Sequence, residues 1–156
     1  MPTALEHDTR QQDDGCWSAE VFPRDGKTSL RASCRLVSRQ TLSLAGEPDL
    51  FVALWERRKG GFVVAHSTMG GREVGATAAT VDDVEAAMAR IETYCATLDP
   101  QAAVRTMDAA LFESPLSSAL SDLARRTART RSFLALVGEA LDEWQGVGTL
   151  DCPTAP

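Results

Sequence analysis

The sequence contains no apolar run near the ~20 residues that a membrane-spanning helix requires. Its first residues, MPTALEHDTRQQDDG, lack the basic start and apolar stretch of a signal peptide. We therefore expect no contact with a membrane and a cytoplasmic location. The chain has 156 residues, of which 44% are apolar, so it is long enough and apolar enough to fold around one core.

Catalytic motifs are also missing. Paired glycines occur only at 60–61 and 70–71, and neither pair belongs to a phosphate-binding GxGxxG or GxxxxGK[ST] motif. There is no GxSxG, and His66 is the only histidine within an expected element, where a structural role is more common than a catalytic one. We expect a protein that is not an enzyme and that needs no cofactor. An enzyme of unfamiliar type remains an alternative, because dispersed catalytic groups leave no motif.

The spacing of the cysteines does not suit a metal. Cys16, Cys34, Cys95 and Cys152 form no CxxC pair, and neither histidine lies near a cysteine in the sequence. Zinc sites usually include at least one close pair of ligands. We expect no metal site, and we interpret Cys34 and Cys95, which fall on apolar faces, as small core residues.

The first half of the chain has the pattern of β-strands. Alternating or β-branched runs lie at 17–22, 30–37 (with a continuation or another strand at 41–44), 50–56, 62–68 and near 73–78. Turns are expected at 23–26, at the glycine pair 60–61 and at 69–72. The run at 50–56 carries apolar side chains on both faces, so we expect it to be a central strand.

The second half is helical. Residues 80–98 combine a capping sequence, Thr80-Val-Asp-Asp83, with apolar residues at steps of three and four. Val104, Met107 and Leu111 indicate a short helix, and the spacing from 115 to Trp144 fits one helix of about 30 residues or two that break near 130–132. We predict an α+β fold with an N-terminal antiparallel sheet of about 4–5 strands and about 3 helices packed on one face. The domain would span 16–148, between a polar acidic tail at 1–15 and a C-terminal tail at 149–156.

Charge is distributed unevenly along the chain. The net charge is -6 overall, with -4 in residues 1–26, +4 in 27–80 and -6 in 81–156. On the expected strand, Arg31, Arg35 and Arg39 share a face if the strand is unbroken, and Arg57, Arg58 and Lys59 lie at the hairpin tip. These six are the candidate nucleic-acid contacts. No aromatic residues are interleaved with them, which favours an ordinary solvated face.

Four more arginines, Arg125, Arg126, Arg129 and Arg131, lie within seven positions of the long helix. Asp122 precedes the first two by three and four residues, the order that favours helical ion pairs. Helical geometry places Arg129 on the same outer side and Arg131 on the opposite flank. An acid within the cluster argues against phosphate binding, so we interpret it as a solvated or protein-contacting face.

The outer face of 80–98 carries small residues: Ala86, Ala89, Thr93 and Ala96. Acidic residues surround this face: Asp82, Asp83, Glu85 and Glu92. Alanine is a good helix former, and that alone accounts for part of the pattern. The other interpretation is that a helix or a partner packs here.

Composition and charge together favour a non-enzymatic acidic protein that binds a protein with a basic surface. We expect an inhibitor or antidote acting on a nucleic-acid-processing protein, of the anti-CRISPR or immunity type. The expected partner-binding residues are Asp82, Asp83, Glu85, Ala89, Glu92, Arg125 and Arg129. Alternatives are a nucleic-acid-binding protein that uses the basic sheet face and hairpin tip, and a secretion-type chaperone. The sequence leaves the partner's identity and the oligomeric state open.

Overall fold

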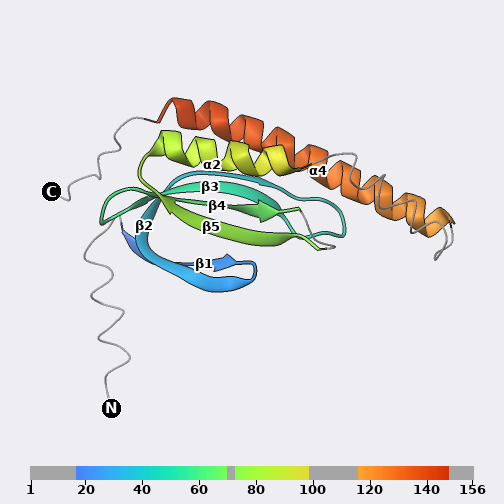
Figure 1. Cartoon of the computed structure of the whole chain (residues 1–156), viewed down its shortest axis with the longest axis horizontal. Helices are drawn as coiled ribbons and strands as arrows, with labels where there is room; N and C mark the ends of the chain where they lie inside the picture. The colour runs from blue at the N-terminus through green and yellow to red at the C-terminus, as the bar shows by residue number, and fades with distance from the viewer. Residues whose placement is uncertain (1–16, 70–72, 99–115, 148–156) are drawn as a thin grey trace, which may run out of the picture.

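The protein is described by a computed structural model that covers residues 17–69, 73–98 and 116–147 (Figure 1). Its elements are β1 (Ser18–Arg24), β2 (Lys27–Leu42), β3 (Leu50–Arg57), β4 (Phe62–Thr68), β5 (Gly75–Val81), α2 (Val84–Thr97) and α4 (Leu116–Gln145). An α+β fold with an N-terminal antiparallel sheet is confirmed, with five strands. The described ranges contain two helices rather than about three. The helix expected near 104–111 lies outside them.

The five strands form an antiparallel meander in the order β1-β2-β3-β4-β5. The predicted hairpin at 50–68 is confirmed, and Gly60 and Gly61 take φ values of 101° and 77° in its turn, a conformation that side chains disfavour. The first turn is shorter than predicted. β1 continues through Pro23, with an irregular register between Phe22 and Arg24, and only Asp25 and Gly26 connect the strands.

The sheet curls along the long strand β2, whose two halves pair with different strands. This strand has 16 residues; its first half pairs with β1 and its second half with β3. The curl brings the β1–β2 turn to β5, where the Asp25 amide donates to the Ala76 carbonyl (2.9 Å). The Asp25 carboxylate accepts from the Ala76 amide (3.2 Å) and from the Thr68 hydroxyl. One polar residue thus joins the two ends of the sheet.

Both faces of β3 are covered, as its sequence predicted. Figure 1 shows α2 and α4 together over β3, β4 and β5, with β1 on the other side of these strands. The core between helices and sheet includes Leu50, Val52, Leu54, Val64, Ala87, Ile91, Phe133, Leu136, Val137, Ala140 and Trp144. A second cluster inside the curl contains Phe22, Cys34, Val63, Ala65 and Ala78, with Trp55 at its edge. Phe22 meets Trp55 edge-on, with ring centroids 5.6 Å apart.

The first described helix begins later than its sequence pattern predicted. Asp83 is the N-cap of α2, and its carboxylate accepts from the Ala86 amide at 2.7 Å. Val81 is the last residue of β5, although its side chain still packs against the helix-side core. Because Val81 fits both the alternation of a strand and the spacing of a helix, the sequence pattern did not fix the boundary between β5 and α2.

The long helix α4 is continuous over 30 residues, which resolves the choice between one helix and two. Its fully buried apolar residues lie in the second half: Phe133, Leu136, Val137, Ala140 and Trp144. Leu120, expected on the apolar stripe, is 47% exposed. Neither helix in the described part of the chain has the combination of length and hydropathy needed to cross a membrane.

Candidate binding surfaces

The predicted acidic residues lie along α2, from just before its first turn to Glu92 in its second half. Glu85, Ala89 and Glu92 are spaced four and three residues apart and therefore lie on one side of the helix. Asp82 and Asp83 precede its first turn, and all five residues are exposed. We refer to these five as the acidic ridge.

Within the described residues, none of the four ridge carboxylates forms an ion pair. Asp83 is engaged locally, as the helix cap, and the others make no hydrogen bond to a described residue. Ala89 leaves the middle of the ridge without a bulky side chain. The ridge is thus a negatively charged surface that a flat partner surface can approach closely.

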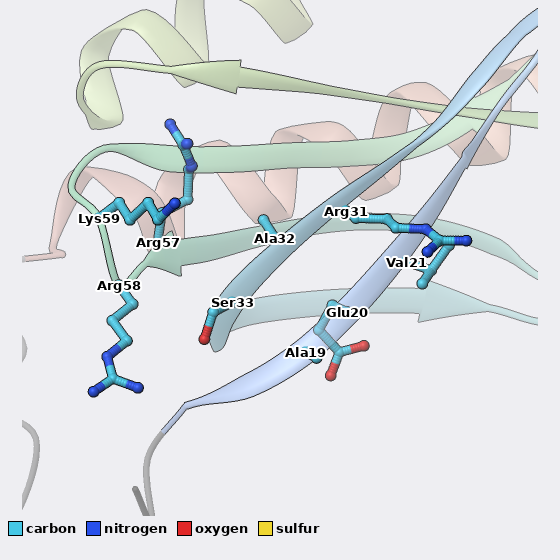
Figure 2. Close-up of a pocket in the computed structure, with 9 residues that line it drawn as sticks. All are labelled: Ala19, Glu20, Val21, Arg31, Ala32, Ser33, Arg57, Arg58 and Lys59. Carbon is cyan, nitrogen blue, oxygen red and sulfur yellow. The ribbon is translucent and has the colours of Figure 1, made fainter. Parts of the chain in front are cut away.

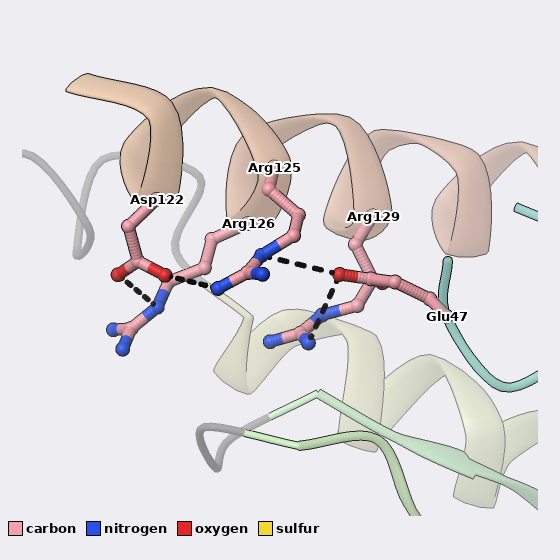
Figure 3. Close-up of polar contacts among 5 residues, drawn as sticks. All are labelled: Glu47, Asp122, Arg125, Arg126 and Arg129. Atoms are coloured by element: carbon pink, nitrogen blue, oxygen red, sulfur yellow. Dashed lines mark hydrogen bonds and ion pairs between the residues drawn. The ribbon is translucent and has the colours of Figure 1, made fainter. Parts of the chain in front are cut away.

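The arginine cluster on α4 is largely neutralised by its own neighbours (Figure 3). Arg125 donates to Asp122 at 2.6 Å, and Arg126 lies 3.0 Å from the other oxygen of the same carboxylate. These are the two helical ion pairs that the spacing predicted. Arg131 is exposed, as expected for the opposite flank.

Arg129 corrects the sequence-based placement, because it faces inward. Its side chain is only 4% exposed, and its guanidinium lies 3.8 Å from Glu47 in the β2–β3 loop. Glu47 also pairs with Arg125 at 3.4 Å, so one carboxylate joins two turns of α4 to the sheet (Figure 3). Arg129 precedes the buried Phe133 by one helical turn, which places it on the core-facing line. Arg125, the other arginine that pairs with Glu47, remains accessible, with 59% of its side chain exposed.

Four of the six basic candidates line one pocket of about 480 Å³ between β1, β2 and the β3–β4 turn (Figure 2). They are Arg31, Arg57, Arg58 and Lys59, with Glu20 as the acidic member. The tip is held against β2 by a bond from the Arg58 amide to the Ser33 carbonyl (2.9 Å). Figure 2 shows Arg57 and Arg58 pointing to opposite sides of the tip, so the charges form a basic surface rather than a closed anion cage.

The other two basic candidates lie elsewhere. A bulge between Leu36 and Ser38 shifts the register of β2 and reverses which side chains face the helices. Arg35 pairs with Glu56 (2.6 Å) and stacks over Trp17, whereas Arg39 lies over Phe51 on the opposite face of the sheet. The expectation that Arg31, Arg35 and Arg39 share one face is therefore wrong, because it assumed an unbroken alternation.

Of the two cysteines in the described ranges, Cys34 is buried and Cys95 is half-buried. Burial raises the pKa of the Cys34 and Cys95 thiols, which keeps them protonated at neutral pH. No group of three or more histidine, cysteine and acidic side chains with metal-binding geometry occurs in the described ranges. Cys16 and Cys152 lie outside those ranges.

No protein-family model, no curated protein and no solved structure matches this chain. The chain's own surfaces are therefore the basis for inferring its function.

Proposed function

We propose that this protein is a non-enzymatic binding protein whose acidic ridge on α2 engages a protein with a basic surface. The proposal is carried by one contrast between the two helices. The ridge carboxylates are exposed and without ion pairs among the described residues, whereas three of the four α4 arginines, Arg125, Arg126 and Arg129, contact Asp122 or Glu47. Exposed charge of one sign steers a complementary partner and accelerates its association.

The partner class we propose is a nucleic-acid-processing protein, with this chain as its inhibitor or antidote, as in anti-CRISPR and immunity proteins. Such enzymes hold nucleic acid in basic grooves, because phosphate contacts supply much of the affinity. An acidic helix that occupies such a groove competes with the nucleic acid. The chain's net charge of -6 adds to the attraction.

The contact surface differs slightly from the one predicted from sequence. Arg129 is left out, because its side chain is only 4% exposed. Arg125 stays as an accessible candidate on α4, with 59% of its side chain exposed. Asp83 contributes charge but also caps α2, so its substitution would disturb the helix by about 1 kcal/mol as well as the surface.

Affinity capture from the native host tests the proposal. The wild type is compared with Glu85→Lys/Glu92→Lys, which reverses two ridge charges without touching the cap. Glu139→Lys/Asp142→Lys is the matched control, since both residues are exposed on α4 and the charge change is the same. All captures are performed with and without nuclease.

We expect the wild type to capture a basic protein in the presence of nuclease. The ridge variant should fail to capture this protein, and the control variant should capture it as the wild type does. Capture that needs nucleic acid would contradict the proposal. So would equal loss with the ridge and control variants, since that would reflect overall charge alone.

A nucleic-acid-binding function is the second candidate, favoured by the pocket that gathers Arg31, Arg57, Arg58 and Lys59. Mobility-shift titrations with DNA and RNA at low salt test it, using Arg31→Gln/Lys59→Gln and the control Arg131→Gln. Micromolar binding that the pocket variant abolishes, with a steep salt dependence, would establish this function in place of the first. Absence of binding by the wild type would remove it.

A further inference from the structure

An open pocket of about 440 Å³ lies beside the acidic ridge, between α2 and strands β4 and β5. Its polar lining comes from His66 on β4, Thr77 on β5, and Arg90, Thr93, Tyr94 and Thr97 on α2. Ala89 forms part of its rim. The volume is within the range of about 300–1,000 Å³ that small-molecule sites occupy.

His66 is the buried polar residue of this pocket, with 3% of its surface exposed. Its Nδ1 lies 2.8 Å from the Ser67 carbonyl, an acceptor, so Nδ1 carries the proton of the neutral ring. Nε2 then holds a lone pair and makes no hydrogen bond to a described residue. Tyr94 and Phe133 flank the ring, with centroids 4.6 and 6.1 Å away, and fix its orientation.

The imidazole is neutral at physiological pH. Burial lowers the pKa of His66, and the nearby positive charge of Arg90 lowers it further, although the Ser67 bond acts in the other direction. Nε2 is therefore a hydrogen-bond acceptor that has no donor among the described residues. A neutral acceptor in the same pocket as the positive charge of Arg90 suits a ligand that has both a hydroxyl group and an anionic group.

The hydroxyl groups on α2 complete this pattern. Thr93 donates to the Ala89 carbonyl at 2.8 Å, and Thr97 donates to the Tyr94 carbonyl at 2.6 Å. Both side-chain oxygens have thus used their protons and face the pocket only as acceptors. Arg90 is the one cation among the lining residues.

We propose that this pocket binds a small hydroxy acid. The ligand's hydroxyl group donates to His66 Nε2, with the threonine oxygens as further acceptors, and its carboxylate pairs with Arg90. Apart from Ala89, the pocket residues lie outside the acidic ridge. Binding of a hydroxy acid therefore does not depend on whether the ridge binds a protein partner.

Nuclear magnetic resonance of the His66 ring nitrogens tests the proposal directly, since His7 is the only other histidine. Lactate, malate and 4-hydroxybenzoate are the probes. Propionate and lactamide are the comparators for lactate, because one lacks the hydroxyl group and the other the charge. We expect a saturable change at Nε2 with at least one probe, and at least about tenfold weaker binding of both comparators if lactate is that probe.

Two variants locate the binding. Arg90→Gln removes the cation and Ala89→Phe fills the rim, and both positions are exposed on α2, so the fold should tolerate them. We expect each to weaken binding at least about tenfold. The matched controls Arg131→Gln and Ala96→Phe, exposed and outside the pocket lining, should bind as the wild type does. The proposal is overturned if none of the three probes changes the Nε2 signal saturably at concentrations up to about 20 mM, where even a very weak site would be filled. It is also overturned if the pocket variants bind like their controls.

Discussion

Arg129 shows how one charged residue can belong to the core side of a helix. It lies one turn before Phe133, on the line that continues through Leu136 and Ala140. A buried guanidinium needs a counter-charge, which Glu47 provides from a loop about eighty residues earlier in the chain. The arginine that sequence analysis assigned to partner binding therefore attaches α4 to the β2–β3 loop.

Removing Glu47 should destabilise the fold more than removing an exposed acid. We expect Glu47→Ala to lower the free energy of unfolding by about 1–3 kcal/mol, because it removes the Glu47 carboxylate from beside the buried Arg129 guanidinium. Asp122→Ala, whose ion pairs are exposed, should cost at most about 1 kcal/mol. Urea denaturation of both variants measures the difference, and equal effects would contradict the structural role of Glu47.

His66 should make stability depend on pH. Its folded-state pKa lies below the 6.5 of an exposed histidine, so the unfolded chain binds the proton first as the pH falls. The stabilising contribution of the neutral ring is complete above pH about 6.5 and decreases below it, down to the lowered pKa. The free energy of unfolding should therefore fall between pH 7.5 and 5.5 in the wild type and in His7→Gln. His66→Gln should lose this component, and an unchanged slope in that variant would show that His66 is not its source.

At the scale of elements, local sequence signals predicted the β3–β4 hairpin and the presence of the helix α2. The glycine pair at 60–61 between two β-prone runs predicted the β3–β4 hairpin, and the capping sequence at 80–83 predicted a helix whose start lies at the Asp83 cap, three residues later than the first residue of that sequence. Both features are fixed by residues within a few positions of each other, which a sequence pattern contains.

Features set by distant packing were missed. The bulge near Val37 turns Arg39 to the other face of β2, and nothing in the local alternation marks it. The apolar stripe of α4 was predicted only in part. A spacing of three and four residues that ends at Trp144 includes the buried Val137 but misses Phe133, Leu136 and Ala140, which are buried as well. The sheet that covers α4 decides which side chains are enclosed. The basic pocket joins β1, β2 and the β3–β4 turn, and the His66 pocket joins β4, β5 and α2, so both depend on how separate elements pack together.

The closure of the curled sheet should be sensitive to one glycine. A Cβ on Gly75 would collide with the Asp25 carboxylate and lie 2.6 Å from the Thr68 hydroxyl oxygen. Gly75→Ala should therefore displace Asp25 from its bonds with Thr68 and Ala76, at a cost of about 1–3 kcal/mol. Gly138→Ala is the control: its Cβ would meet nothing within 4 Å, and alanine should stabilise α4 by about 0.5–1 kcal/mol. Thermal unfolding measures both, and a neutral Gly75→Ala would show that the closure contributes little.

At the scale of the whole molecule, folding changes what the charge count implies. In the basic middle of the sequence Arg35 meets Glu56, and on α4 three of the four arginines, Arg125, Arg126 and Arg129, meet Asp122 or Glu47. The acids of the ridge form no ion pair with a described residue. In the described part of the chain, the negative ridge and the basic pocket at the β3–β4 tip are two surfaces on which charge of one sign gathers, and the ridge matches the sign of the net charge.

The most direct test of this account is the association rate constant with the captured partner, measured from low to high salt. Glu85→Lys/Glu92→Lys should slow association about tenfold or more at low ionic strength, and the difference should shrink as salt shortens the screening length to about 3 Å at 1 M. Arg125→Glu should slow it less or speed it. An unchanged rate in the ridge variant, or a larger loss on changing Arg125, would contradict the claim that the acidic ridge meets the partner.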